Sequence, residues 1–284
     1  MADPKHHLPH RLVIAADPGI LERLDPAEGV LIHDDADVVI ATHQRMGERL
    51  KQIHFKGPLS DAVRIQKHEK QIVKVFADSK NHLIQEAKHL REKPFLVCPS
   101  YPVQTREDIS MVTSMGLAVD LVHILDHLPP AAARDILEYY LHTEALSVPI
   151  EPFHAVLLSK MTNANLSLWH LNLVYPGQFL YADHRGLAED PDELRRGEYM
   201  FVFTPPGDHP KATGRDSSLQ DFFDSLPRRH PQCLACRHYH ICAGWGVYKK
   251  ESCGLWIDLL DALQSASREL RALESFDRDN PSGS

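Results

Sequence analysis

The stretch Cys233-Leu-Ala-Cys236-Arg-His-Tyr-His-Ile-Cys242-Ala-Gly-Trp-Gly246, followed by Cys253, holds four of the five cysteines of this 284-residue chain. Two residues separate the first pair, five the next and ten the last. Thiolates are soft ligands that suit zinc or an iron–sulfur cluster. Cysteines clustered in this way in a cytosolic chain point to metal binding rather than to disulfides. The spacing therefore predicts one metal site with Cys233, Cys236, Cys242 and Cys253 as its ligands.

The spacing alone leaves three interpretations open: zinc, an iron–sulfur cluster, or thiols that bind no metal. A structural zinc site commonly uses paired CxxC elements, and here there is one such pair plus two single cysteines. His238 and His240 lie inside the loop and could each replace a cysteine at zinc. Small and aromatic residues follow Cys242 and would instead shield a cluster and let backbone amides approach its sulfurs. The fifth cysteine, Cys98, lies in an apolar segment closed by prolines, where a small buried side chain is expected.

Composition excludes several classes of protein. The hydrophobic content of 43% is enough for a full core. The formal net charge of −8 speaks against general nucleic-acid binding, which needs a basic surface. There is no continuous apolar run of about 18 residues, so no membrane span is expected. The first residues, 1–11, are polar and rich in histidine and do not look like a signal peptide, so a cytoplasmic protein is expected.

The first part of the chain alternates short apolar runs with amphipathic stretches, which is typical of α/β architecture. The patterns predict strands over 11–16, 29–33, 38–41, 62–65 and 94–99. They predict helices from Thr42 through Ile53, over 66–92 with a break near residue 78, and over 106–115 and 153–161, with a further helix that starts at Pro129-Pro130. The polar run between residues 34 and 37 suits a hairpin turn.

The pattern changes after residue 165. Strands are expected over 166–174, 179–183 and 199–204, and helices over 219–226 and 254–276. We therefore expect a degenerate α/β domain over residues 1–165, a small α+β cysteine domain over 166–276, and a disordered tail over 277–284.

The segment from Phe222 to Pro227, the CxxCxxxxxC motif, the Ala-Gly-Trp-Gly that follows it and a cysteine that opens a helix resemble a known region. They are similar to the C-terminal SPASM or twitch region of radical SAM peptide-modifying enzymes, which binds auxiliary 4Fe–4S clusters. In that family a β-hairpin precedes the cysteine loop, and residues 179–186 match it in position. The resemblance covers roughly residues 166–275 and is most specific over 219–256. It implies one 4Fe–4S cluster on Cys233, Cys236, Cys242 and Cys253, the last of these matching less closely.

The chain departs from that family in two ways. Members with two auxiliary clusters carry further cysteines in the hairpin and in a CxGGC-like turn, whereas this chain has Gly246 where the second cysteine of that turn often stands. No cysteine precedes Cys98, so the CxxxCxxC motif that binds the radical-generating cluster is missing. The chain therefore resembles the pseudo-radical-SAM proteins that accompany radical SAM maturases of ribosomally made peptides. The implied fold is a degenerate partial β/α barrel followed by a SPASM/twitch-like domain.

That resemblance implies a non-catalytic iron–sulfur accessory protein. It would form a hetero-oligomer with a radical SAM enzyme, bind the precursor peptide, or relay electrons, without nucleic acid or membrane. One alternative is an enzyme with unrelated chemistry in the degenerate barrel, where His33, Asp34, Asp35 and Asp37 could form a metal or acid–base group. The other is a structural zinc-binding assembly module.

Overall fold

The structure is a computed structural model of the whole chain. It describes two long runs of residues in the first third of the sequence, most of the middle third, and the C-terminal helices. The described residues are 12–15, 18–23, 28–66, 73–90, 95–99, 103, 105–122, 124–144, 146–172, 179–183, 186–188, 219–249 and 252–279.

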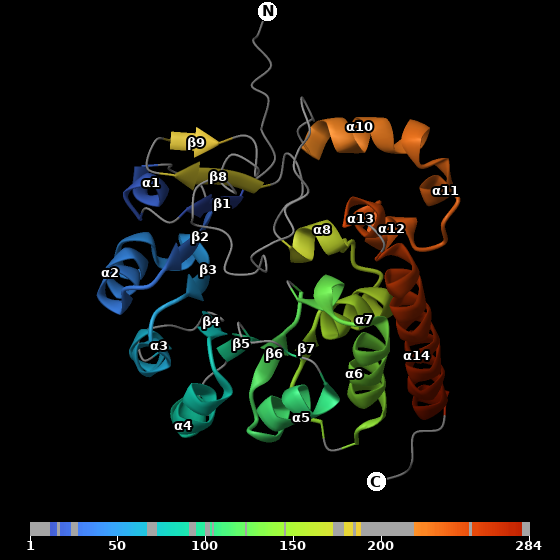
Figure 1. Ribbon diagram of the computed structural model, residues 1–284, viewed down its shortest axis with the longest axis horizontal. Coiled ribbons are helices and arrows are strands. Elements are labelled where there is room, and N and C mark those ends of the chain that lie inside the picture. The colour runs from blue at the N-terminus through green and yellow to red at the C-terminus, as the bar shows by residue number, and fades with distance from the viewer. Residues whose placement is uncertain are drawn as a thin grey trace, which may run out of the picture. The chain divides into compact units, whose positions relative to one another are not determined.

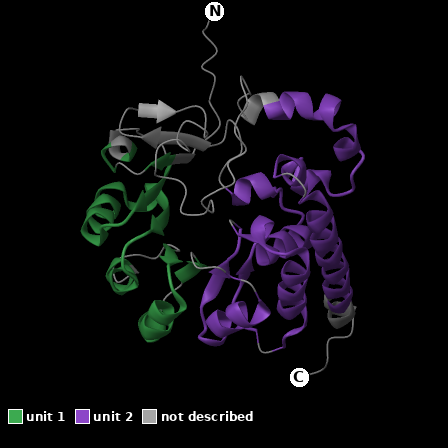
Figure 2. Ribbon diagram, in the orientation of Figure 1, with its two compact units in different colours: residues 1–101, 174–221 green, residues 102–173, 222–284 purple. Residues whose placement is uncertain are grey.

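The chain divides into two compact units, drawn in different colours in Figure 2. Unit 1 comprises residues 1–101 and 174–221, and unit 2 comprises residues 102–173 and 222–284. Each unit therefore contains two separate stretches of sequence. These units are defined by contacts between residues. The expected domains, 1–165 and 166–276 with a boundary at residue 165, stay a prediction.

Unit 1 is built from alternating strands and helices (Figure 1). Its elements in chain order are β1 (Leu12–Ala15), α1 (Pro18–Arg23), β2 (Glu28–His33), α2 (Ala36–Met46), the 3-10 turn η1 (Gly47–Arg49), β3 (Leu50–Phe55), α3 (Leu59–Gln66), β4 (Val73–Ala77), α4 (Lys80–Leu90), β5 (Phe95–Pro99), β8 (Phe179–Asp183) and β9 (Gly186–Ala188). The strand order within the unit is β5-β4-β3-β2-β1-β8-β9. All neighbours are parallel except β8 and β9, which are antiparallel.

The two faces of this sheet differ in polarity. Side chains alternate between the faces of a strand, so residues in register share a face. On one face the apolar side chains of Ile53, Phe55, Val73, Val75 and Val97 lie together, all at 0% exposure. The opposite face carries His54, Lys74 and Cys98, which are also buried. Cys98 is thus buried within strand β5, as expected for a small hydrophobic side chain.

Unit 2 is mainly helical (Figure 1). It contains α5 (Arg106–Ser114), β6 (Ala118–Asp120), η2 (Leu125–His127), α6 (Pro130–His142), β7 (Ile150–Glu151), α7 (Phe153–Thr162), α8 (Leu168–Leu171), α10 (Leu219–Arg229, in this unit from Phe222 on), α11 (Pro231–Leu234), α12 (Tyr239–Cys242), α13 (Trp245–Tyr248) and α14 (Cys253–Asp279). Strands β6 and β7 form a short parallel pair.

Helix α14 packs along α7 through an apolar stripe and through polar contacts between the two helices. Trp256, Leu259, Leu260 and Leu263 are at most 2% exposed. The Lys160 ammonium donates to Gln264 Oε1 at 2.7 Å. The Arg271 guanidinium donates to the last carbonyls of α7, which a helix end leaves without intrahelical partners. The long C-terminal helix expected over 254–276 is confirmed, and it is fixed to the core along its first half.

Several other expected elements are confirmed. Strands β1, β2, β5 and β8 and helices α5, α6, α7 and α10 lie where the patterns predicted them. Pro130 occupies the first turn of α6, a position that needs no N–H donor. The expected antiparallel hairpin near residues 179–186 is present as β8 and β9, but β8 also pairs with β1 of unit 1. The expected strand over 199–204 lies outside the described residues.

Five predictions of local structure are wrong. Residues 34–41 do not form a hairpin, because the Asp35 carboxylate accepts from the Asp37 and Val38 amides and starts helix α2 there. The expected helix from Thr42 through Ile53 is therefore the end of α2 followed by strand β3. The expected strand over 62–65 is helix α3, and the expected helical stretch 66–92 contains strand β4. The expected strand over 166–174 contains helix α8, which the Ser167 side chain caps.

The predicted α/β class is confirmed, and the alternating strands and helices of unit 1 are consistent with a partial β/α fold. Among the described helices, none is long and apolar enough to cross a membrane.

Candidate functional site

The four clustered cysteines all belong to unit 2 and lie on three helices and one turn. Cys233 lies in α11, Cys242 ends α12 and Cys253 opens α14, while Cys236 lies in the turn between α11 and α12. Short backbone hydrogen bonds hold that turn, since the Cys236 amide donates to the Cys233 carbonyl at 3.1 Å. In Figure 1, α11, α12 and α13 gather near the N-terminal end of α14, so the final cysteine meets the loop that carries the others.

The four thiols are close enough to influence one another electrostatically. Burial raises the pKa of Cys233, and the neighbouring Cys253 and Cys236 raise it further. Burial also raises the pKa of Cys253, with Cys236 adding to the effect. Burial raises the pKa of Cys242 as well, and the neighbouring Cys253 and Cys233 add to this rise. No disulfide joins these residues. The predicted ligands are thus brought together as a group of neighbouring thiols.

The group is not arranged at coordinating distance. Across the described residues, no three His, Cys, Asp or Glu side chains converge in a geometry that could hold a metal ion. The four thiols are neighbours, and loading a metal would require them to turn inward as they lose their protons.

Backbone amides approach one of the sulfurs. The Gly246 amide donates to Cys242 Sγ at 3.5 Å, and this contact, with one from Gly244, works against the rise in the Cys242 pKa. Two left-handed residues create this approach, Ala243 at φ 43° and Gly244 at φ 85°. Hydrogen bonds from backbone N–H groups stabilise a thiolate and tune an iron–sulfur cluster. The amides therefore favour the ionised, metal-binding form of Cys242.

Gly246 also controls how closely the loop meets α14. A Cβ at this position would lie 2.7 Å from Cys253 Cα and 3.2 Å from its amide nitrogen, which are backbone atoms that cannot move aside cheaply. The Ala-Gly-Trp-Gly segment thus allows the loop to pass directly against the cysteine that opens α14.

A buried carboxylate fastens both sides of the cysteine loop to the body of unit 2. Asp126, in η2, accepts from Trp245 Nε1 at 3.0 Å and from Trp256 Nε1 at 2.6 Å. Trp245 follows Cys242 by three residues and Trp256 follows Cys253 by three. Burial raises the pKa of Asp126, although the two indoles and the Lys249 charge partly oppose the shift. We call these three side chains the Asp126 clamp.

An aromatic cluster covers the loop. The Trp169 ring of α8 lies 4.9 Å from Trp245, 4.7 Å from Phe223 and 4.9 Å from Tyr248. Its indole N–H donates to the Ala243 carbonyl at 3.1 Å, next to Cys242. Trp169 is 0% exposed. The cluster excludes water from one side of the loop and holds its left-handed turn.

His238, inside the cysteine loop, is oriented by a carboxylate. Its Nε2 lies 2.6 Å from Asp261 Oδ1, and the Arg237 guanidinium also contacts Asp261. The side chain is only 3% exposed. Within the described residues, its other ring nitrogen, Nδ1, is buried and has no hydrogen-bond partner.

The remaining residues considered from the sequence lie elsewhere. Cys98 is in β5 of unit 1, whereas the other four cysteines belong to unit 2. Asp35 caps α2, and its amide donates to His33 Nδ1 at 2.9 Å, while Asp37 pairs with Arg64. His33 Nδ1 also lies 3.5 Å from Asp34 Oδ1. These side chains lie at the start of helix α2, where a hairpin turn was expected, and among the described residues they form no group that could hold a metal ion.

Sequence reasoning missed Asp126 and Trp169. Each lies far from the cysteines in sequence, and neither belongs to a motif. The signal that could have found Asp126 is a single acidic residue next to the apolar run 118–125. Comparison with known proteins adds nothing to the sequence here, since no family model, curated protein or solved structure matches the chain.

Proposed function

We propose that this chain is a non-catalytic iron–sulfur accessory protein with one 4Fe–4S cluster, held by Cys233, Cys236, Cys242 and Cys253. The observation that carries the proposal is the grouping of four thiols from α11, α12, their connecting turn and α14, with backbone amides directed at Cys242. Four soft donors, no disulfide and a loop shielded by aromatic rings fit a cluster.

Such a cluster supplies one-electron transfer or structural support, because four thiolate ligands leave no iron open to substrate. The residues around it have separate tasks. The Gly246 and Gly244 amides stabilise the Cys242 thiolate. The Asp126 clamp fixes the two segments that carry Cys242 and Cys253. Trp169 and its neighbours limit the access of water.

The proposed partner follows from the resemblance to SPASM or twitch regions over residues 219–256. The chain would assemble with a radical SAM maturase of a ribosomally made peptide, and would bind the precursor peptide or relay electrons through its cluster. The missing CxxxCxxC motif supports an accessory role.

A zinc site is the second candidate, and His238 is the observation that favours it. A histidine that binds a metal usually donates its other ring N–H to a carboxylate. His238 has such a carboxylate in Asp261 at 2.6 Å, and its buried Nδ1 has no partner among the described residues. A zinc ion with three cysteines and His238 would give a structural assembly module.

A matched set of cysteine variants tests the site. We expect Cys236→Ala to abolish metal loading, because it removes one of four ligands, and Cys98→Ala to leave loading unchanged, because Cys98 is buried in β5. His238→Ala should leave a cluster on four cysteines intact but should remove zinc. Metal content per chain and the absorption spectrum are the readouts. Equal loss of metal from Cys236→Ala and Cys98→Ala would mean that the ligand set is wrong.

The accessory role has its own test. The reduced protein is incubated with S-adenosylmethionine, alone and with a radical SAM maturase and its precursor peptide. We expect cleavage products only when the maturase is present. Cleavage by this chain alone would contradict a non-catalytic role.

A further inference from the structure

A group of basic side chains lies in unit 2, where α7, the loop that carries the cysteines and α14 meet. Its members are Lys160 of α7, Arg237 and His240 of the loop, and Arg268 and Arg271 of α14. We call these five side chains the basic patch. The whole chain has a formal net charge of −8, so its composition alone does not predict a local excess of positive charge. Figure 1 shows α7 and α14 side by side, with α12 near the N-terminal end of α14.

The carboxylate of Asp261 on α14 holds the loop side of the patch. The Arg237 guanidinium donates to Asp261 Oδ2, and Nε2 of the buried His238 lies 2.6 Å from Asp261 Oδ1. These contacts join the two residues that directly follow Cys236 to α14. The patch is therefore fixed next to a cysteine of the predicted metal site.

Basic side chains from separate helices lie close enough for their charges to interact. Lys160 is only 8% exposed, and its ammonium donates to Gln264 Oε1 at 2.7 Å. Burial lowers the pKa of Lys160, while the nearby Asp261 charge opposes this shift and the Arg268 charge adds to it. Burial also lowers the pKa of His240, and the Lys160 charge adds to that shift. Like charges held this close favour the approach of an anionic group.

The patch stays positive after the carboxylates beside it are counted. The carboxylates of α14 whose side chains the structure describes already have partners: Asp258 with Arg134, Asp261 with Arg237 and His238, and Glu269 with Ser265. The Arg237 side chain is 72% exposed, and the other exposed members are His240, Arg268 and Arg271. Arg271 donates to neutral acceptors, the Met161 carbonyl and Asn163 Oδ1, so its charge is not cancelled there.

The patch is too long for a small anion to span, and it suits the surface of a protein. A helix rises about 1.5 Å per residue, so Asp261 and Arg271 lie about 15 Å apart along α14. Leu234, in the same loop as Arg237, is 50% exposed and offers an apolar contact. Protein interfaces commonly combine an apolar centre with a polar rim. The expected partner is therefore a protein that presents carboxylates.

We propose that the basic patch docks a small acidic one-electron carrier protein. Carboxylates of the carrier would face Arg237, Arg268 and Arg271. The choice of an electron carrier rests on the proposed function, because Arg237 directly follows Cys236 and a partner bound here lies beside the cysteine group. Complementary charges steer such partners together, and complexes between electron-transfer proteins have small interfaces.

Isothermal titration calorimetry tests the docking, with the full chain purified without oxygen and an acidic plant-type ferredoxin as the probe. Binding should weaken about tenfold when salt is raised from about 50 mM to about 300 mM, because salt screens exposed charges. Millimolar inorganic phosphate at constant ionic strength should not displace the ferredoxin. No binding at low salt, binding that salt leaves unchanged, or displacement by phosphate would overturn the proposal.

The same sample separates this proposal from the proposed function. Its iron, zinc and sulfide content reports on the metal, whereas the calorimetry reports on the charges of the chain. Zinc without sulfide, together with salt-dependent binding of the ferredoxin, would contradict the cluster and support the patch. A complete cluster together with no binding would support the cluster and overturn the patch.

Variants place the partner on the patch. Arg268→Glu should weaken binding about tenfold or more, and its exposed position on α14 lets the variant fold. Arg237→Gln, at the loop side, should weaken binding about threefold or more.

Arg106→Glu is the matched control. Arg106 on α5 contacts Asp135 and the Tyr139 ring of α6. Helix α6 contacts both α5 and α14 and lies between them in Figure 1. The control should therefore bind the ferredoxin as the parent does. Unchanged affinity in Arg268→Glu, or an equal loss in Arg106→Glu, would contradict docking on the patch.

Discussion

Gly246 shows how strongly a single residue constrains the cysteine site. An alanine there would place Cβ 2.7 Å from Cys253 Cα, so the loop or the start of α14 must shift. We expect Gly246→Ala to reduce metal loading and to lower the free energy of unfolding by about 1–3 kcal/mol, as overpacking does. Gly254→Ala is the control, because its Cβ would meet nothing within 4 Å.

Metal content and denaturant unfolding are measured for both glycine variants. The control should load metal normally and keep or gain up to about 1 kcal/mol, as alanine favours a helix. Identical behaviour of the two variants would show that Gly246 does not set the approach of the loop to Cys253.

Asp126 is a polar residue whose removal should destabilise the region around the cysteines. Asp126→Ala would leave the Trp245 and Trp256 indole N–H groups without their acceptor. Each unsatisfied buried group costs about 1–3 kcal/mol, so we expect the two to lower the free energy of unfolding by about 2–6 kcal/mol. Urea unfolding followed by circular dichroism measures it. Asp258→Ala breaks only an exposed pair with Arg134 and should cost less than about 1 kcal/mol.

The same carboxyl predicts a pH dependence. Burial raises the pKa of Asp126 in the folded chain, so the folded state binds its proton more tightly than the unfolded state does. Its contribution to the free energy of unfolding is therefore greatest at low pH and decreases as pH rises above about 4. Asp126→Asn removes this titration. The parent should lose stability relative to the variant as pH rises from about 4, and a difference that is constant with pH would refute the shift.

At the scale of elements, the short helix α8 is what the cysteine loop packs against. Trp169 contacts four aromatic side chains of α10 and α13 and bonds the Ala243 carbonyl. We expect Trp169→Ala to cost about 3–5 kcal/mol, because it removes a fully buried large ring. Trp169→Phe should recover part of this. Urea unfolding followed by circular dichroism measures both variants. If both have the same free energy of unfolding as the parent, the proposed packing of α8 is wrong.

Elements with strong local signals could be predicted from the sequence. In these elements a few neighbouring residues are enough to indicate the structure. Examples are the apolar stripe of α14, Pro130 at the start of α6 and Gly116 after α5. Some failures arise because short apolar runs such as 62–65 suit either a strand or a helix. Others arise because a side chain such as that of Asp35 caps a helix where a turn was expected. Tertiary pairing decides between strand and helix, as it does for β4, which is held by pairing with the separate strands β3 and β5.

The site was predictable only in part for a similar reason. The spacing of four cysteines is local, so their grouping could be anticipated. Asp126 lies more than a hundred residues from its two tryptophans, and no sequence pattern links them. Contacts of this kind depend on how distant segments pack, and they are visible only in the fold.

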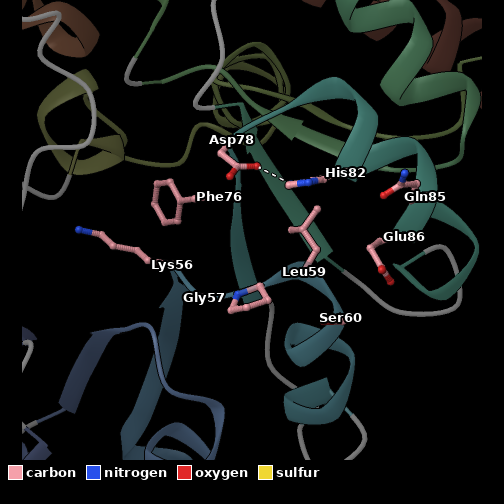
Figure 3. Close-up of a pocket in the computed structure, with 10 residues that line it drawn as sticks. Lys56, Gly57, Leu59, Ser60, Phe76, Asp78, His82, Gln85 and Glu86 are labelled. Atoms are coloured by element: carbon pink, nitrogen blue, oxygen red, sulfur yellow. Dashed lines mark hydrogen bonds and ion pairs between the residues drawn. The ribbon is translucent and has the colours of Figure 1, made fainter.

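At the scale of the molecule, unit 2 carries both the cysteine group and the basic patch, whereas unit 1 contains a cavity at the carboxyl ends of β3 and β4 (Figure 3). If a metal is bound by unit 2, it stabilises the folded state by mass action. Chelation should therefore lower the melting temperature of the parent but not that of Cys236→Ala. Equal melting temperatures of the loaded and chelated parent would show that the bound metal does not support the fold.

The most direct measurement is the metal, sulfide and absorption analysis of the full chain purified without oxygen. A 4Fe–4S cluster on the four cysteines predicts about four iron and about four sulfide per chain, with a broad band near about 400 nm that bleaches on reduction. About one zinc per chain, with no sulfide and no colour, would contradict the cluster.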